Sequence, residues 1–284
     1  MNSDAIPPIE PGEPQPVGSS GAAPVPETPS PPAIPNDLAT PWDILDLVVL
    51  FCFSLGMLYL LTNAMAVFAV LRLGVPPGQI ERFAATNAGF VVSRQILWFG
   101  FILLFLYAVI HRRTTQPFWQ TIGWRRLRVG ELGAGILVPA LLLGGILLGL
   151  GADVASQFYN TTKELPIEAL FASRRGIEYL MAFGILIAPL AEETVFRGYV
   201  YPVLARKFGI LMGIALTGIL FGMVHVPQLW GGWGQIATLV AVGMTLTAVR
   251  AVTHSVFASY LVHLGYNGFL FAGLFVSPLV MRHS

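Results

Sequence analysis

Long apolar segments recur along the chain from residue 43 onward and are separated by short polar connections. An apolar run of about 18 or more residues is long enough to cross a bilayer as a helix, whereas barrel strands would alternate apolar and polar positions. The pattern therefore predicts an all-α fold, a polytopic transmembrane helical bundle of about seven helices. An eighth, short or re-entrant segment near the C-terminus is the alternative. The seven predicted segments are 43–71, 88–110, 131–153, 177–205, 209–226, 234–250 and 254–280.

The composition agrees with this prediction. Hydrophobic residues make up 55% of the 284 residues and charged residues only 11%, whereas soluble domains carry about 25% charged residues. We therefore expect the lipid bilayer as a partner and no nucleic acid. A single cysteine, Cys52, excludes an intramolecular disulfide and a cysteine-based metal cluster.

The first 41 residues differ from the rest of the chain. They contain 12 of the 21 prolines and five acidic residues, without any Lys or Arg. A segment with so little apolar surface cannot offset its chain entropy, so we predict that it is disordered. The chain then divides into a Pro-rich acidic tail (1–41), N-terminal transmembrane helices with a basic loop (42–125), and a core that carries the polar motifs described below (126–284).

The loop between the second and third apolar segments fixes the expected orientation. It contains no acidic residue and five arginines, namely Arg112, Arg113, Arg125, Arg126 and Arg128. Because Lys and Arg concentrate in cytoplasmic loops, we expect this loop to be cytoplasmic. Threading outward from it predicts a multi-pass protein of the cell membrane with a cytoplasmic N-terminal tail and an external C-terminus.

Three ionisable residues, Glu192, Glu193 and Arg197, lie in the middle of the apolar segment 177–205. A charge at mid-bilayer costs roughly 2.5–3.5 kcal/mol, so each of them needs a reason. Glu193 and Arg197 are four residues apart and can pair on one helical face, either to lock helix packing or to orient a site. Glu192 is rotated by about 100° from Glu193 and can point into a cavity. Pro189 removes a helix hydrogen bond and predicts a kink.

Further polar side chains follow on later segments, with His225 near the end of one and His263 and Asn267 on the last. Taken singly, each of them could be an interfacial residue or an interhelical hydrogen-bonding residue. At about 1.5 Å rise per residue, however, Glu192 and these three all lie roughly 20–25 Å from the cytoplasmic ends of their segments. Their common depth predicts that they meet within the bilayer.

Such a cluster offers hydrolytic chemistry. Glu192 with His225 could activate a water by general acid–base catalysis, and His263 with Asn267 could donate hydrogen bonds to an oxyanion. Glu192, His225 and His263 could instead hold a zinc ion with one open water position. No His-Glu-x-x-His motif is present, so the cofactor is left open between one divalent ion and none.

The polar residues form three motifs in chain order: Glu192-Glu193-x-x-x-Arg197, Phe221-x-x-x-His225 and His263-x-x-x-Asn267. Together they resemble the CPBP family, which comprises CAAX-processing type II intramembrane endopeptidases and bacteriocin-processing or abortive-infection proteins. The resemblance covers approximately residues 125–280 and all three motifs are complete.

The resemblance implies roles for the motif residues. Glu192 and His225 would activate the water, while His263 and Asn267 would stabilise the oxyanion. With Glu193 and Arg197 they form the candidate catalytic set. The implied substrate is a membrane-associated protein or peptide, with or without a prenylated CAAX-type C-terminus, and the implied peptidase is either glutamate-dependent or metal-dependent.

Two other functions compete with a peptidase. One is a non-catalytic membrane immunity or scaffold protein of the same fold, although such a protein is free to lose motif residues and none is missing here. The other is a proton-coupled carrier, for which mid-membrane Glu and His are also typical. A carrier is disfavoured because the two halves of the chain show no paired repeats or broken helices.

Overall fold

The computed structural model describes residues 37–127, 132–159, 165–171 and 174–276, and all regular elements in this part of the chain are helices. The all-α prediction is confirmed, and each of the seven predicted segments has a helical counterpart within a few residues. These counterparts are α1 (Ile44–Leu73), α3 (Ala88–His111), α5 (Ala134–Ser156), the stretch Arg174–Phe208, α9 (Ile210–Met223), α10 (Trp233–Thr253) and α11 (Val256–Val276). Shorter helical pieces are η1 (Pro77–Gln79), α2 (Ile80–Thr86), α4 (Phe118–Thr121) and η2 (Pro166–Phe171).

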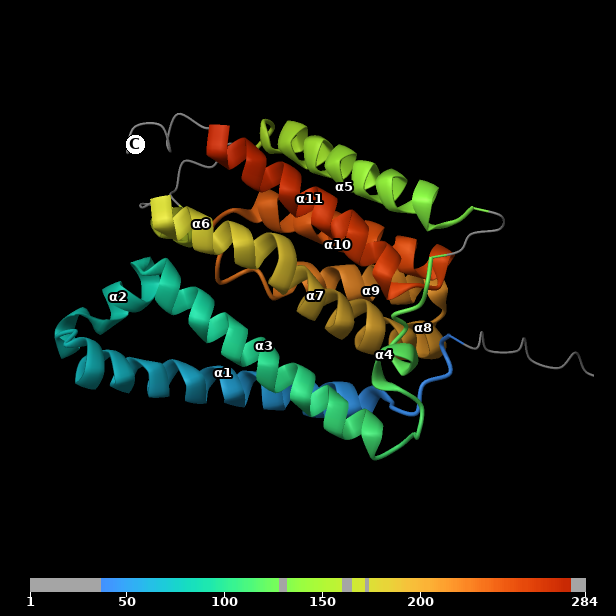
Figure 1. Ribbon diagram of the computed structural model, residues 1–284, viewed down its shortest axis with the longest axis horizontal. Coiled ribbons are helices and arrows are strands. Elements are labelled where there is room, and N and C mark those ends of the chain that lie inside the picture. The colour runs from blue at the N-terminus through green and yellow to red at the C-terminus, as the bar shows by residue number, and fades with distance from the viewer. Residues whose placement is uncertain (1–36, 128–131, 160–164, 172–173, 277–284) are drawn as a thin grey trace, which may run out of the picture. The chain divides into compact units, whose positions relative to one another are not determined.

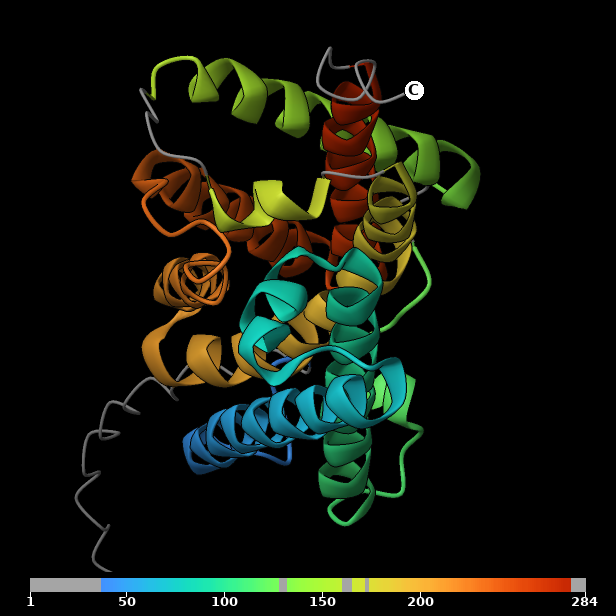
Figure 2. The same cartoon turned by 90° about the vertical axis from the view of Figure 1, so that its left-hand side faces the viewer.

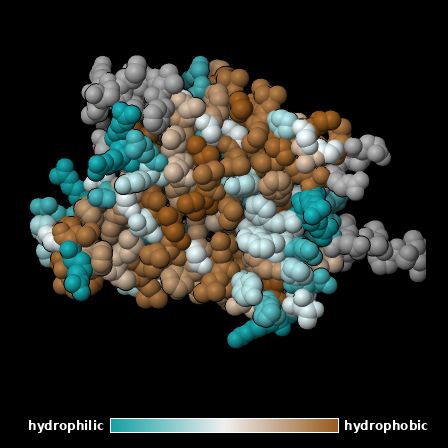
Figure 3. Space-filling model, viewed as in Figure 1, coloured by the Kyte–Doolittle hydropathy of each residue, from teal (hydrophilic) through white to brown (hydrophobic). Residues whose placement is uncertain are grey.

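Five of these helices are long and apolar enough to cross a membrane: α1, α3, α5, the stretch Arg174–Phe208 and α10. The helix α9 is shorter, with 14 residues, and α11 has 21 residues. On the face shown in Figure 3, hydrophobic side chains cover the middle of the helical body, and hydrophilic ones gather toward its two ends. This distribution is the one that a protein surrounded by lipid requires.

The helices pack around the stretch Arg174–Phe208. On one side α3 lies between α1 and the start of this stretch, and on the other side α11 packs against it and against α5 (Figures 1 and 2). The helix α9 packs on the end of the stretch and on α10. The stretch, α10 and α11 therefore form the centre, with α1 and α5 on the outside.

Glycines allow two pairs of helices to approach closely. A β-carbon at Gly145 of α5 or at Gly265 of α11 would overlap the backbone of the other helix. Gly218 of α9 and Gly243 of α10 meet in the same way, with 3.0 Å between an added β-carbon and the Gly218 backbone. Small residues at such contacts are how membrane helices gain packing energy without a hydrophobic driving force.

The stretch Arg174–Phe208 is a single helical run with two wide turns. Its parts are α6 (Arg174–Ala182), the π-helical η3 (Phe183–Ile187), α7 (Ala188–Glu193), the π-helical η4 (Thr194–Val200) and α8 (Tyr201–Phe208). Each π-helical turn is followed, after one residue, by a proline, Pro189 or Pro202. Because a proline ring clashes with the carbonyl four residues earlier, a wider turn accommodates it. The disturbance predicted at Pro189 thus takes the form of a π-helical turn.

Residues 37–42 lie against the ends of α8 and α10. The Asp37 carboxylate accepts hydrogen bonds from Arg250 Nη1 at 2.9 Å and His254 Nδ1 at 3.0 Å. The Trp42 indole donates to the Tyr199 carbonyl at 2.9 Å, and Arg206 donates to the Trp42 carbonyl at 2.8 Å. The rest of the predicted disordered tail (1–36), Arg128 and the end of the last predicted segment (277–280) lie outside the described residues, so those predictions stay open.

Candidate active site

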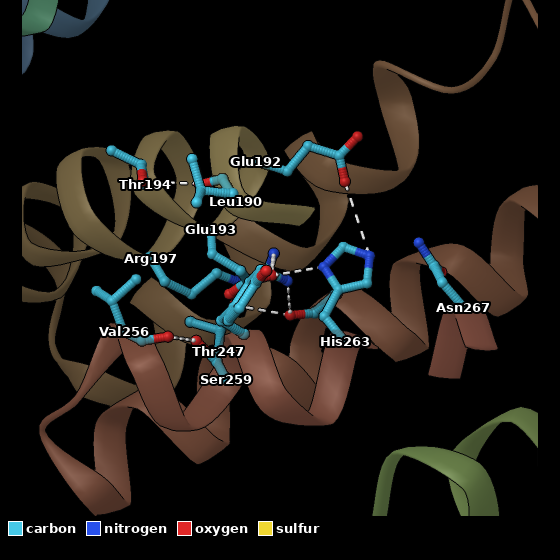
Figure 4. A network of polar contacts seen from close by, with 12 residues as sticks. Leu190, Glu192, Glu193, Thr194, Arg197, Thr247, Val256, Ser259, His263 and Asn267 are labelled. Carbon is cyan, nitrogen blue, oxygen red and sulfur yellow. Dashed lines mark hydrogen bonds and ion pairs between the residues drawn. The ribbon is translucent and has the colours of Figure 1, made fainter. Parts of the chain in front are cut away.

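The structure brings side chains of the three motifs together: Figure 4 shows those of the first and last motifs, and His225 of the second lies 4.0 Å from Glu192. Glu192 and Glu193 lie on α7, His225 lies in the turn after α9, and His263 and Asn267 lie on α11. In Figure 4 the Glu192 side chain points away from the Glu193–Arg197 contact and approaches the His263 ring from another side. The predicted pairing of Glu193 with Arg197 is confirmed, and Glu192 faces His225 as expected, but both glutamates also lie near His263.

Glu193 and Arg197 form a fully buried ion pair. Arg197 Nη1 lies 2.8 Å from Glu193 Oε1, and both side chains have no exposed surface. The other guanidinium nitrogens donate to the Gly243 carbonyl at 2.8 Å and the Thr247 hydroxyl at 3.3 Å, and the guanidinium lies over the Phe221 ring at 4.6 Å. A buried ion pair is tolerated only when its remaining donors are satisfied, and α10 supplies these acceptors.

Glu193 has a second partner that the sequence analysis missed. His263 Nδ1 lies 2.8 Å from Glu193 Oε1, the same oxygen that binds Arg197. A carboxylate only accepts hydrogen bonds, so Nδ1 carries a hydrogen and Nε2 faces the opposite direction. Glu193 and His263 are 70 positions apart in the sequence, so no local spacing could have predicted this contact.

Glu192 lies between two imidazoles. Its Oε2 is 3.7 Å from His263 Nε2, and its Oε1 is 4.0 Å from His225 Nε2. These separations are too long for direct hydrogen bonds. The Glu192 and His225 side chains are 16% and 18% exposed. They form the accessible part of the cluster, whereas the Glu193–Arg197 pair is fully buried.

The His225 ring is held from its other side. Its Nδ1 lies 2.7 Å from the Phe221 carbonyl, and the ring packs on Phe221 at a centroid distance of 4.9 Å. Because a carbonyl accepts, Nδ1 donates and the neutral ring presents the lone pair of Nε2 to Glu192. The four-residue spacing of Phe221 and His225 therefore sets both the orientation and the tautomer of the histidine.

Asn267 lies one turn beyond His263 on α11, and its Nδ2 donates to the Gly184 carbonyl of η3 at 2.7 Å. The sequence analysis did not predict this partner. Glu192 thus lies between the two histidines without bonding either directly, and Asn267 is hydrogen-bonded to the wide turn that precedes α7.

The alternative zinc ligand set is Glu192, His225 and His263. Zinc ligands lie about 2.0–2.2 Å from the metal, which requires three donor atoms to converge on one point. Among the described residues, no three His, Cys, Asp or Glu side chains are grouped so that they could hold a metal ion. In this arrangement the three side chains do not fit a zinc site, and the chemistry proposed below uses protein groups and water.

Residues 175–269 match the sequence profile of the family described as type II CAAX prenyl endopeptidase Rce1-like. The comparisons with curated proteins and with solved structures gave no match. The matched segment includes all three motifs, from Glu192 to Asn267, and lies within the region on which the resemblance was based. That resemblance is confirmed. Over residues 175–269 the chain is therefore similar to the Rce1-like type II CAAX prenyl endopeptidases.

Proposed function

We propose that this protein is an intramembrane endopeptidase that hydrolyses a peptide bond of a membrane-associated protein or peptide through a water activated by Glu192 and His225. One observation carries the proposal. The Glu192 carboxylate lies within 4.0 Å of the Nε2 atoms of two histidines from different segments, while the neighbouring Glu193 is committed to Arg197.

The geometry suits activation of water. A gap of 4.0 Å between Glu192 Oε1 and His225 Nε2 is short enough for one water to hydrogen-bond both atoms. Glu192 takes a proton as the water oxygen forms a bond to the substrate carbonyl carbon. The same proton then passes to the leaving nitrogen as the C–N bond breaks, which regenerates the carboxylate.

His263 and Asn267 suit the stabilisation of the tetrahedral oxyanion. When His263 is protonated on both nitrogens, Nδ1–H bonds Glu193 and Nε2–H is free to donate toward the reacting centre. The buried carboxylate of Glu193 orients this ring through Nδ1, and Arg197 holds the carboxylate in place. Asn267 uses one amide N–H at Gly184 and has a second to donate.

The proposed substrate is a lipid-modified C-terminus, of the prenylated CAAX type. The family description of residues 175–269 supports this choice, as does the position of the cluster among helices that are apolar enough to cross a membrane. An unmodified membrane peptide and a non-catalytic immunity or scaffold protein of the same fold are the competing outcomes.

The test is cleavage by purified protein in bilayer discs, measured by mass spectrometry on matched prenylated and unprenylated peptides. We expect the wild type to cut the prenylated peptide at higher kcat/KM. His225→Ala and Glu192→Ala should each lower kcat by about 10²–10⁴-fold. Glu178→Gln, a half-exposed acid on the same helical stretch, serves as the control and should cleave normally.

Each other outcome has a definite meaning. Cleavage that survives in both variants contradicts the mechanism, and equal cleavage of both peptides contradicts the prenyl substrate. A folded wild-type protein that cuts neither peptide supports the non-catalytic alternative.

A further inference from the structure

The Gly184 carbonyl is left without a backbone partner by the sequence around it. In η3 the Ala188 N–H bonds the Phe183 carbonyl, five residues back, in π-helical register. The next donor in that register, for Gly184, would be residue 189, which is a proline and has no N–H. In α-helical register the donor would be Ala188, but its N–H is already bonded to Phe183.

Asn267 takes the place of the missing donor. Gly184 is partly buried, and a carbonyl without a partner is costly inside a bilayer, where no bulk water can replace the bond. The Asn267 Nδ2 atom lies 2.7 Å from the Gly184 oxygen, which satisfies the carbonyl from α11. The vacancy created by Pro189 is therefore filled by a side chain of the candidate site.

The absence of a side chain at position 184 makes this contact possible. A β-carbon there would lie 2.6 Å from the ring of Phe271, the residue one turn beyond Asn267 on α11. With glycine at this position, the helix surface that carries Asn267 and Phe271 can reach the backbone of η3.

We infer that Pro189 is a positioning residue for Asn267: by withholding its backbone N–H, it reserves the Gly184 carbonyl as the anchor of the Asn267 amide. The inference rests on the proposed function of Asn267. A carbonyl can bind the NH₂ end of the amide but not its oxygen, so this anchor fixes which end faces which way. Asn267 then offers its second N–H, not its oxygen, to the developing oxyanion.

The direct test is Pro189→Ala, which restores an N–H that can bond the Gly184 carbonyl and release Asn267. We expect kcat to fall by about 10–100-fold, with KM nearly unchanged. This fall should not exceed the one caused by removing an oxyanion donor altogether. The thermal midpoint should be unchanged or higher, because proline is unfavourable inside a helix. A purely structural role for Pro189 would not lower kcat alone.

Pro202→Ala is the matched control, because Pro202 follows η4 as Pro189 follows η3. In the same register, Pro202 leaves the Arg197 carbonyl without its backbone N–H donor. Since that carbonyl binds no proposed oxyanion donor, Pro202→Ala should change kcat by less than about twofold. In an Asn267→Ala background, Pro189→Ala should cause no further loss. A full second loss of kcat there, or an unchanged kcat in Pro189→Ala alone, overturns the inference.

A second readout does not depend on activity. The ¹⁵N-labelled side-chain amide of Asn267, assigned with Asn267→Asp, should exchange with solvent slowly in the wild type and faster in Pro189→Ala, with a changed ¹H shift. Identical amide signals in the two proteins overturn the inference. A wild-type protein that cleaves no peptide contradicts the proposed function but leaves this amide comparison valid.

Discussion

Glu192 and Glu193 are neighbours in the sequence but have opposite surroundings. Glu193 has no exposed surface and shares one oxygen between Arg197 and His263. Glu192 keeps part of its exposure and faces Nε2 of both histidines. The difference follows from the rotation of about 100° between successive helical residues, which turns Glu193 toward Arg197 and Glu192 toward the partly exposed His225.

Glu193→Gln should destabilise the protein, since it leaves the Arg197 guanidinium buried without a countercharge. Breaking a buried pair by removing one partner costs about 3–5 kcal/mol in the free energy of unfolding. Glu192→Gln should cost less than about 1 kcal/mol, because a partly exposed side chain without a direct partner loses little. Denaturant unfolding in mixed micelles measures both. Equal destabilisation by the two substitutions would show that our division of roles is wrong.

At the residue scale, the sequence analysis predicted the pairing of Glu193 with Arg197 because both residues lie on one helix, at a spacing that dictates contact. It could not predict the bond between His263 and Glu193 or between Asn267 and Gly184, because these depend on how α11 docks on α7 and η3. The nearest available signal was Pro189, whose missing N–H implies a carbonyl in need of a partner.

The helix α11 is held in place by α5 as well as by the central stretch. Gly145 of α5 and Gly265 of α11 face each other so closely that neither position has room for a β-carbon. Because α11 carries His263 and Asn267, the α5 contact helps to set the distance between these side chains and Glu192. A helix that supplies no motif residue thus still influences the site.

Gly145→Val should push α5 away from α11. Overpacking of this kind costs typically about 1–3 kcal/mol in the free energy of unfolding, and the shift of α11 should also lower kcat. Gly144→Val is the control, because an added β-carbon at Gly144 meets nothing within 4 Å. Thermal unfolding and peptide cleavage of the two variants, measured side by side, check the prediction. Matching effects at 144 and 145 would contradict the proposed close contact.

At the element scale, hydropathy predicted the seven apolar segments because each helix faces either lipid or the apolar interior of the bundle, and both require apolar side chains along its length. The π-helical turns η3 and η4 were not predicted, since they change the hydrogen-bond register without changing hydropathy. They occur where Pro189 and Pro202 interrupt the register, and they set the faces that α7 presents to α11 and that α8 presents to α9.

Across the whole molecule, the segment before α1 ties the ends of several helices together. Asp37 contacts Arg250 at the end of α10 and His254 beyond it. Leu38 packs on Tyr201 and Ala205 of α8, and Trp42 stacks on Tyr199 at 4.8 Å. This clasp joins the start of the first membrane helix to helices more than 150 residues away.

Asp37 should make stability depend on pH. Burial alone would raise its pKa, but the hydrogen bonds from His254 and Arg250 outweigh burial and hold the pKa below its ordinary value of 3.8. A carboxyl whose pKa is lower in the folded state stabilises the protein above pH 3.8, and this contribution is lost as the pH falls through the folded-state pKa. The thermal midpoints of wild type and Asp37→Asn should therefore differ at pH 7 and converge in acid. As a control, Asp153→Asn, which changes an exposed residue of α5, should have the wild-type midpoint at every pH. A pH-independent difference for Asp37→Asn would contradict the ion-pair role.

The orientation in the membrane remains a proposal that rests on the arginine-rich loop after α3. In a Cys52→Ser background, a cysteine at the exposed position Thr115 should react with a membrane-impermeant thiol reagent only from the cytoplasmic side. A cysteine at Gln157, exposed at the other end of α5, should react only from outside. The reverse labelling pattern would show that the protein has the opposite orientation in the membrane, with the same arrangement of the candidate active site.

The central claim is that Glu192 activates the attacking water, and single-turnover cleavage of a membrane-embedded peptide by chelator-treated protein tests it most directly. Wild-type protein should keep its rate after chelation, and Glu192→Gln should lower the rate by about 10²–10⁴-fold while remaining folded. A Glu192→Gln variant that cleaves at the wild-type rate would contradict the account, and loss of wild-type cleavage that is restored by added zinc would require a metal-dependent mechanism instead.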